Sequence, residues 1–161
     1  MTRVRWWWVG MVSLLMIAGA LEGCSEGEHG DDRHGSGVCF LVSEVEPNAT
    51  SRTAQFLDHL FIDDCFIVAG SILTATDVDS YRVLIRENLT LVVALDHSLL
   101  ADFDILLFDA DTGQLIRDCG ASVVPEVCTV SFVVLSGAIA VDVVVLSEVG
   151  AGTYTLTLDA Q

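Results

Sequence analysis

The chain has no lysine, and its seven basic residues, all arginine, are outnumbered by 23 acidic residues, which leaves a net charge of −16. A surface this acidic repels the phosphates of nucleic acids and of anionic lipids, so we expect no direct binding to either. The carboxylates favour hard cations such as Ca²⁺, which prefer oxygen ligands. Solubility, or growth in an acidic or saline habitat, explains the same charge without any ligand.

Several catalytic motifs are also missing. The sequence has no Gly-x-Ser-x-Gly nucleophile motif, no glycine-rich phosphate loop and no Cys-x-x-Cys pair. These absences argue against the corresponding serine hydrolases, nucleotide-binding enzymes and zinc or redox centres. Asp102 and Asp104 have the residue types of a glycosidase pair, but they lie only two residues apart at the entry of an expected strand. We therefore expect a protein that is not an enzyme, with a small acidic hydrolase as the alternative.

The N-terminus lacks an apolar run long enough to cross a bilayer. The uncharged run 6–21 has 16 residues, fewer than the roughly 20 that a membrane-spanning helix needs. A basic start, a short apolar run and a small residue at its end are typical of a secretory signal. The ending Leu21-Glu22-Gly23-Cys24 resembles the lipobox of bacterial lipoproteins, in which the signal is cleaved before the cysteine and the thiol receives a diacylglycerol.

This resemblance implies a signal peptide over residues 1–23 and a lipid anchor at Cys24, with the rest of the chain on the exported side of a bacterial cell envelope. Glu22 departs from the lipobox, where a small or apolar residue is usual. Ser25 in place of Asp resembles the outer-membrane lipoproteins of double-membraned bacteria. An uncleaved anchor helix and an ordinary secretory signal are the alternatives. Residues 24–37 have no apolar side chain after the cysteine, and we expect them to form a flexible acidic tether.

Lipidation of one cysteine would leave four for pairing. An even number in an exported chain predicts two disulfides, for which three connectivities exist. Cys119 and Cys128 flank a short connection that contains Pro125, which favours their pairing across a hairpin. Cys39 would then pair with Cys65.

From Val38 onward, short apolar segments alternate with turn residues. Several segments alternate apolar with polar side chains, a period of two that places one face of a strand in a core. Strands at this spacing predict an all-β fold, an antiparallel β-sandwich of about eight or nine strands over residues 38–161. Only Thr53–Leu60 fits a short helix or a helical turn. The expected strands are Val38–Ser43, Cys65–Leu73, Tyr81–Arg86, Leu89–Leu95, Phe103–Phe108, Gln114–Arg117, Val127–Leu135, Ala138–Leu146 and Thr153–Leu158.

Four stretches of this domain carry motifs of a known family. They are Glu44–Asn48, Val68–Tyr81, Asp102–Gly113 and Gly150–Leu156. Taken in order, they resemble the bacterial pre-peptidase C-terminal domain. The resemblance implies a β-sandwich of jelly-roll type, a non-catalytic module that accompanies secreted proteases or other exported enzymes. Some members of the family bind collagen or polysaccharide, and some bind Ca²⁺.

Five oxygen-bearing residues in these stretches are the expected calcium ligands. Glu44, Glu46 and Asn48 alternate along the chain, so an extended conformation places their side chains on one face. Asp77 and Asp79 would bring the set near the roughly six to eight oxygens that Ca²⁺ takes, and calcium-binding members of the family have ligands at matching positions. The alternative is structural, with these side chains capping backbone groups and shaping a loop.

We therefore expect a membrane-anchored exported lipoprotein with one non-catalytic β-sandwich. It would bind an extracellular protein or polysaccharide, or assist a secreted enzyme. A purely structural envelope protein is the alternative from another class.

The anchor can be tested directly. Replacing Cys24 with Ser removes the thiol that would carry the diacylglycerol, so the protein should leave the membrane fraction. Cell fractionation followed by immunoblotting measures the change. Ser25→Ala keeps the thiol and should leave the protein in membranes. A Cys24→Ser protein that stays in membranes would indicate an uncleaved helix instead.

Overall fold

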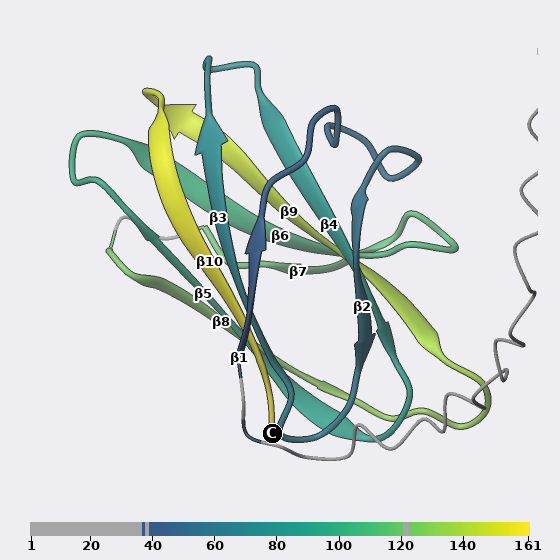
Figure 1. The fold of residues 1–161 in the computed structure, drawn as a ribbon. Helices are drawn as coiled ribbons and strands as arrows, with labels where there is room; N and C mark the ends of the chain where they lie inside the picture. Colours follow the sequence, from purple (N-terminus) through teal and green to yellow (C-terminus); the bar gives the residue numbers. More distant parts are fainter. Residues whose placement is uncertain (1–36, 38, 121–122) are drawn as a thin grey trace, which may run out of the picture. The chain divides into compact units, whose positions relative to one another are not determined.

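The computed structural model describes Gly37 and residues 39–120 and 123–161 (Figure 1). The expected signal peptide, Cys24 and most of the tether lie outside the described residues. By its contacts the chain divides into two units, and every described residue belongs to the unit Asp31–Gln161. Within the described ranges, no helix is long and apolar enough to span a membrane.

The described residues form ten strands and no helix. The strands are β1 (Cys39–Ser43), β2 (Gln55–Leu60), β3 (Cys65–Ile72), β4 (Val78–Ile85), β5 (Leu89–His97), β6 (Asp102–Asp109), β7 (Leu115–Asp118), β8 (Glu126–Phe132), β9 (Ile139–Val149) and β10 (Gly152–Ala160). They make two five-stranded sheets, with the orders β1-β3-β10-β5-β8 and β2-β4-β9-β6-β7. The sheets pack together as a sandwich (Figure 1). The expected all-β sandwich is thus confirmed.

Both sheets are mixed, because each has one parallel pair at an edge. β1 runs parallel to β3, and β2 runs parallel to β4, whereas the remaining pairs are antiparallel. One side chain ties the two edge strands together. The Gln55 Nε2 donates to the Ser43 carbonyl at 3.0 Å, and its Oε1 accepts from the Val45 amide at 2.8 Å. The β1–β2 connection therefore links one sheet to the other.

The segment that fits a short helix, Thr53–Leu60, is largely a strand, so that interpretation is wrong. Gln55–Leu60 forms β2, with a bulge between Phe56 and Asp58. Leu60 at its end is fully buried. A parallel strand takes its hydrogen bonds from a partner distant in the sequence, so the local pattern of β2 did not reveal the pairing.

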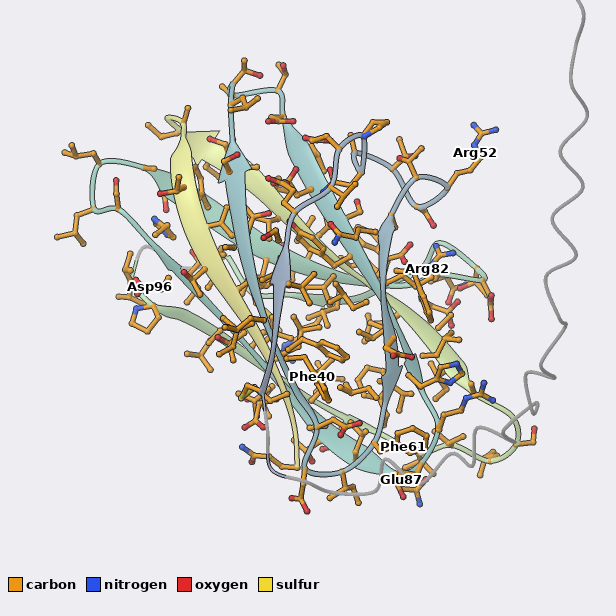
Figure 2. All side chains as sticks on the ribbon, in the orientation of Figure 1. Phe40, Arg52, Phe61, Arg82, Glu87 and Asp96 are labelled. Carbon is orange, nitrogen blue, oxygen red and sulfur yellow. A yellow bond between two sulfur atoms is a disulfide. The ribbon has the colours of Figure 1, made fainter. Side chains whose placement is uncertain are left out.

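Alternating side chains fill the space between the sheets (Figure 2). Every second residue of β5 is at most 7% exposed, and those between are half-buried, apart from an exposed Asp96. The same alternation places Tyr81 of β4, Phe103 of β6 and Leu156 of β10 in the core. Removal of these apolar surfaces from water is the main stabilising contribution to such a fold.

Two disulfides hold edge strands in place. Cys39–Cys65 joins the first residues of β1 and β3, which are also paired in the sheet. Cys119–Cys128 joins the residue after β7 to β8, and so links edge strands of the two sheets. These are the pairs that the cysteine spacing favoured. Each restricts the unfolded chain and thereby stabilises the fold.

An ion pair on the outer face of one sheet fastens the β1–β2 connection. Arg82 on β4 donates to Asp142 on β9 through Nε at 2.7 Å and Nη2 at 2.8 Å. The same Nη2 donates to the Ser51 carbonyl at 2.7 Å and to its hydroxyl at 2.8 Å. Asp142 is only 2% exposed, whereas the Arg82 side chain is 29% exposed. Asp142 therefore depends on the guanidinium to compensate its buried charge.

Replacing Arg82 with Met should destabilise the fold by about 3 kcal/mol, because it leaves the buried Asp142 carboxylate without its cation. The double variant Arg82→Met/Asp142→Leu should recover most of this loss, since neither charge then remains. Urea denaturation of the four members of the cycle measures the coupling.

Arg52→Met is the matched control, because Arg52 is exposed and points away from the sheets (Figure 2). Its effect should stay within about 0.5 kcal/mol. Equal destabilisation by the single Arg82 variant and the double variant would contradict the role given to this pair.

Candidate functional site

A group of polar side chains collects where the β1–β2 connection passes the ends of β3 and β4. The backbone holds it in place at two points. The Glu44 amide donates to the Ala69 carbonyl of β3 at 3.0 Å, and the Ser80 amide of β4 donates to the Asn48 carbonyl at 3.1 Å. The connection therefore lies against both sheets. The side chains of the group are those of Glu44, Glu46, Asn48, Ser71, Asp79, Tyr81 and Tyr154.

Glu44 is half-buried at the centre of this group and accepts hydrogen bonds on both oxygens. Its Oε2 accepts from the Ser71 amide at 2.9 Å and from the Ser71 hydroxyl at 3.3 Å. Its Oε1 accepts from the Asn48 Nδ2 at 3.2 Å and lies 3.3 Å from the Tyr81 hydroxyl. These donors hold the carboxylate in one orientation between the two sheets.

Asp79 is fully buried beside two tyrosines. The Tyr154 hydroxyl donates to its Oδ2 at 2.6 Å, and the Tyr81 hydroxyl lies 2.6 Å from that of Tyr154. Burial raises the pKa of Asp79 to about 8; Glu44 also raises it, and the hydrogen bond from Tyr154 opposes the shift. Burial likewise raises the pKa of both tyrosines far above the usual range, so each keeps its single proton.

The protons of this chain of contacts can be counted. Three contacts join Asp79, Tyr154, Tyr81 and Glu44 in that order, yet the two hydroxyls supply only two protons. When Asp79 is ionised, Tyr154 donates to it and Tyr81 donates to Tyr154, which leaves the Glu44 contact without a proton. A proton on Asp79, or a cation near both carboxylates, resolves this shortage.

Two buried oxygens of the group find no hydrogen-bond partner in the part of the chain that the structure describes. They are the Oδ1 atoms of Asn48 and Asp79, and both residues are 0% exposed. A buried polar atom left in this state costs roughly 1–3 kcal/mol. Carboxylate oxygens of Glu44, Glu46 and Asp79 lie within 4.8 Å of one another. An all-oxygen donor set of this kind fits Ca²⁺.

The five expected ligands do not all belong to this set. Glu46 is exposed and accepts from the Asn48 amide at 2.9 Å, so it closes the group on the solvent side. Asp77 instead accepts from the Leu73 amide at 2.7 Å and from the Val78 amide at 3.2 Å. It shapes the β3–β4 loop, which is the structural alternative for that residue. Glu44, Glu46, Asn48 and Asp79 are the residues that would hold a cation.

Tyr154 reaches the group because Gly70 has no side chain. A Cβ atom at Gly70 would overlap the phenol ring of Tyr154. The register pairs these two residues directly across β3 and β10. Only glycine therefore allows the hydroxyl to reach Asp79.

Sequence reasoning missed Ser71, Tyr81 and Tyr154 as members of the group. Both tyrosines carried a signal, because each is a polar-tipped residue at an inward position of an alternating strand. These are the only two tyrosines of the chain. Their pairing across the two sheets depends on how the sheets stack, which no local pattern reveals.

A depression of about 710 Å³ lies beside the group. It is open to solvent, and its walls come from the ends of four neighbouring strands, β1, β3, β10 and β5. Glu44, Ser71 and Tyr154 belong to both the group and the wall. The lining residues are Ser43–Glu44, Ala69–Ser71, Asp96–Ser98 and Thr153–Thr155.

The aspartate pair considered for catalysis lies elsewhere. Asp102 and Asp104 are on β6 and do not line the depression. The Nδ1 of His59 on β2 accepts from the Arg86 Nε at 2.7 Å, which is a role in surface packing.

No protein-family model and no curated protein sequence matches the chain. Among solved structures, the chain is similar to the pre-peptidase C-terminal domain of collagenase from Bacillus anthracis. The TM-score is 0.51 at 12% sequence identity, over 73% of this chain and 100% of that one. It is also similar to PliG, a periplasmic lysozyme inhibitor of g-type lysozyme. The Aeromonas hydrophila protein gives a TM-score of 0.48 at 11% identity, over 76% of this chain and 97% of that one. The Salmonella Typhimurium protein gives 0.42 at 12% identity, over 67% of this chain and 100% of that one.

Similarity at these identities concerns the fold. It supports the expected relationship at that level, since the strands from β1 to β10 build a sandwich like that of the collagenase domain. The chain is an all-β sandwich with the architecture of a pre-peptidase C-terminal domain.

Proposed function

We propose that the chain is an exported, non-catalytic binding module anchored by lipid at Cys24. Its β-sandwich would hold Ca²⁺ at the β1–β2 connection and bind an extracellular protein or polysaccharide across the adjacent depression. The observation that carries the proposal is a pair of buried oxygens, on Asn48 and Asp79, that find no hydrogen-bond partner among the described residues and lie beside converging carboxylates. The two disulfides support an exported setting, because such bonds persist in oxidising compartments.

In this proposal, Ca²⁺ would have a structural role. The cation would supply positive charge between the carboxylates of Glu44, Glu46 and Asp79 and accept lone pairs from the two oxygens without partners. An opposite charge beside a buried carboxyl favours its ionised form, so Asp79 would remain a carboxylate. The β1–β2 connection would then be fixed against β3 and β4.

The depression supports binding of an extended partner. Its floor is formed by strand ends and carries small polar side chains such as Thr153 and Thr155. A partner lying there would contact Glu44 and Tyr154 at the edge of the cation group. A β1–β2 connection that is already held in one conformation would lose less conformational entropy when the partner binds. The structural envelope protein remains the second candidate, because the same group stabilises the fold without any partner.

Calcium should raise the melting temperature of chelator-treated protein, because a ligand that binds only the folded state stabilises it. Asp79→Asn keeps the size of the side chain and removes its charge, so it should abolish most of the rise. Asp111→Asn makes the same change on an exposed turn and should leave the rise intact. Absence of any shift at about 10 mM, above the ~10⁻³ M affinities of weak extracellular modules, would remove the calcium site.

Binding across the depression can be measured by co-sedimentation of the full chain in detergent with insoluble polysaccharides and fibrillar collagen. Thr155→Arg places a long side chain in the depression and should weaken binding at least tenfold (about 1.4 kcal/mol). Thr129→Arg is the matched control, since Thr129 is exposed on β8 of the same sheet, outside the depression.

Two outcomes would count against the binding proposal. Equal loss in both variants, or in neither, would mean that the depression is not the contact surface. Failure of the parent chain to bind any polymer, together with failure to retain any protein of its own envelope, would favour the structural role.

A further inference from the structure

The central strand of one sheet is apolar on both of its faces. β9 lies in the middle of the order β2-β4-β9-β6-β7. Val143 and Val145 face the core and are 0% exposed, whereas Val144 and Leu146 alternate with them on the outer face and are half-buried. The outer face of the other sheet differs, because β10 presents polar side chains such as Thr155 there. A strand that is apolar at consecutive positions is typical of a sheet covered on both sides.

The strand register extends this apolar surface across the sheet. Val144 pairs with Leu106 of β6, and Leu146 pairs with Val78 of β4. Residues that pair in register point to the same face of a sheet. At the two edges, Phe56 of β2 and Leu115 of β7 are each 52% exposed. The outer apolar face comprises Val78, Leu106, Phe108, Val144 and Leu146, with Phe56 and Leu115 at its edges.

A groove of about 260 Å³ opens on the outer apolar face. Val78, Phe108 and Val144 belong to its lining. The lining also includes Ala49–Ser51 of the β1–β2 connection and Asp109 at the β6–β7 turn. This volume lies below the roughly 300–1,000 Å³ of pockets for drug-sized ligands. The groove therefore suits one anchoring side chain of a larger partner.

Acidic side chains border the outer apolar face. Asp118 of β7 pairs in register with Leu106. Asp109 lines the groove, and hydrogen bonds from the hydroxyl and the amide of Thr112 lower its pKa, so it remains ionised. The partner of this face therefore meets negative charge beside apolar surface.

The arginines of these strands leave the border acidic. They are Arg82, which is paired with Asp142, and Arg117 on the edge strand β7. A second copy of the chain would bring two acidic borders together, and an anionic membrane would be repelled in the same way. A protein segment with Lys or Arg beside apolar side chains complements both features of the surface.

We propose that the outer apolar face docks a basic amphipathic segment of an exported partner protein. One large apolar side chain of this segment would fill the groove, and flanking Lys or Arg residues would meet Asp109 and Asp118. The depression proposed for polymer binding lies on the other sheet. Docking at the outer apolar face is therefore independent of binding at the depression.

Selection from a library of random peptides displayed on phage tests the chemistry of the partner. The full chain is presented in phosphatidylcholine vesicles, and empty vesicles first remove peptides that bind lipid. Enriched peptides should combine a large aliphatic or aromatic residue with Lys or Arg. The dissociation constant of an enriched synthetic peptide, measured by fluorescence anisotropy, should rise with added salt, which screens ionic contacts. Enrichment of acidic peptides, or of no common pattern, would overturn the proposal.

Variants of the face separate docking from general attraction to an acidic protein. Val144→Glu blocks the groove while it adds negative charge, and should weaken peptide binding at least tenfold (about 1.4 kcal/mol). Leu115→Glu makes a similar change at an exposed position, and so covers the case in which the first variant fails to fold; it should weaken binding about fivefold. Val127→Glu is the matched control, since Val127 is 57% exposed on β8 of the other sheet. Unchanged or tighter binding by Leu115→Glu would show that charge alone attracts the peptide, and would overturn the proposal.

The charged border has its own matched pair of variants. Asp118→Asn removes a negative charge but keeps the oxygen that accepts from the Gly120 amide, and should weaken binding about threefold at low salt only. Asp96→Asn makes the same change on β5 of the other sheet and should leave binding unchanged. Thr155→Arg, which obstructs the depression, should also have no effect. Equal losses from variants on both sheets would contradict docking at this face.

Discussion

The contact between the hydroxyls of Tyr81 and Tyr154, 2.6 Å apart, joins the two sheets inside the sandwich. Tyr81 comes from β4 and Tyr154 from β10, and both are almost fully buried. Other features depend on this contact. Gly70 must lack a side chain so that Tyr154 can reach it, Asp79 accepts a hydrogen bond from the Tyr154 hydroxyl, and Glu44 lies at the other end of the chain of contacts. The candidate calcium site is thus built on a polar contact within the core.

Folding buries several acidic side chains of this chain, and each buried negative charge must be compensated by a cation or by hydrogen-bond donors. Asp142 has the guanidinium of Arg82. Glu44 has amide and hydroxyl donors, whereas Asp79 finds among the described residues only a tyrosine hydroxyl, on one of its oxygens. In the part of the chain that the structure describes, the proposed calcium site lies at one of two places where three carboxylates meet. The chain has no lysine, so few of its own side chains can neutralise buried carboxylates. A bound metal cation can supply the missing positive charge.

The expected sites were only partly predictable from the sequence. Alternation correctly brought Glu44, Glu46 and Asn48 to one place, because neighbouring residues can meet without help from the fold. The sequence does not distinguish Asp77 from Asp79, yet Asp77 caps its own loop while Asp79 is fully buried. Asp102 and Asp104 looked unremarkable as a pair. Their partner Glu126 comes from the opposite sheet, and no spacing along the chain indicates it.

Local patterns determined the all-β class, nearly all strand positions and the favoured cysteine pairs, because period-two alternation and turn residues act over a few neighbours. They also indicated an export signal and lipid attachment at Cys24, which remain predictions. Only the tertiary structure decided that β2 is a strand, that each sheet has a parallel edge, and that Tyr81 meets Tyr154. These features depend on hydrogen bonds and contacts between residues far apart in the sequence. A local segment contains only one partner of each such contact, so its pattern cannot indicate the free energy that the contact contributes.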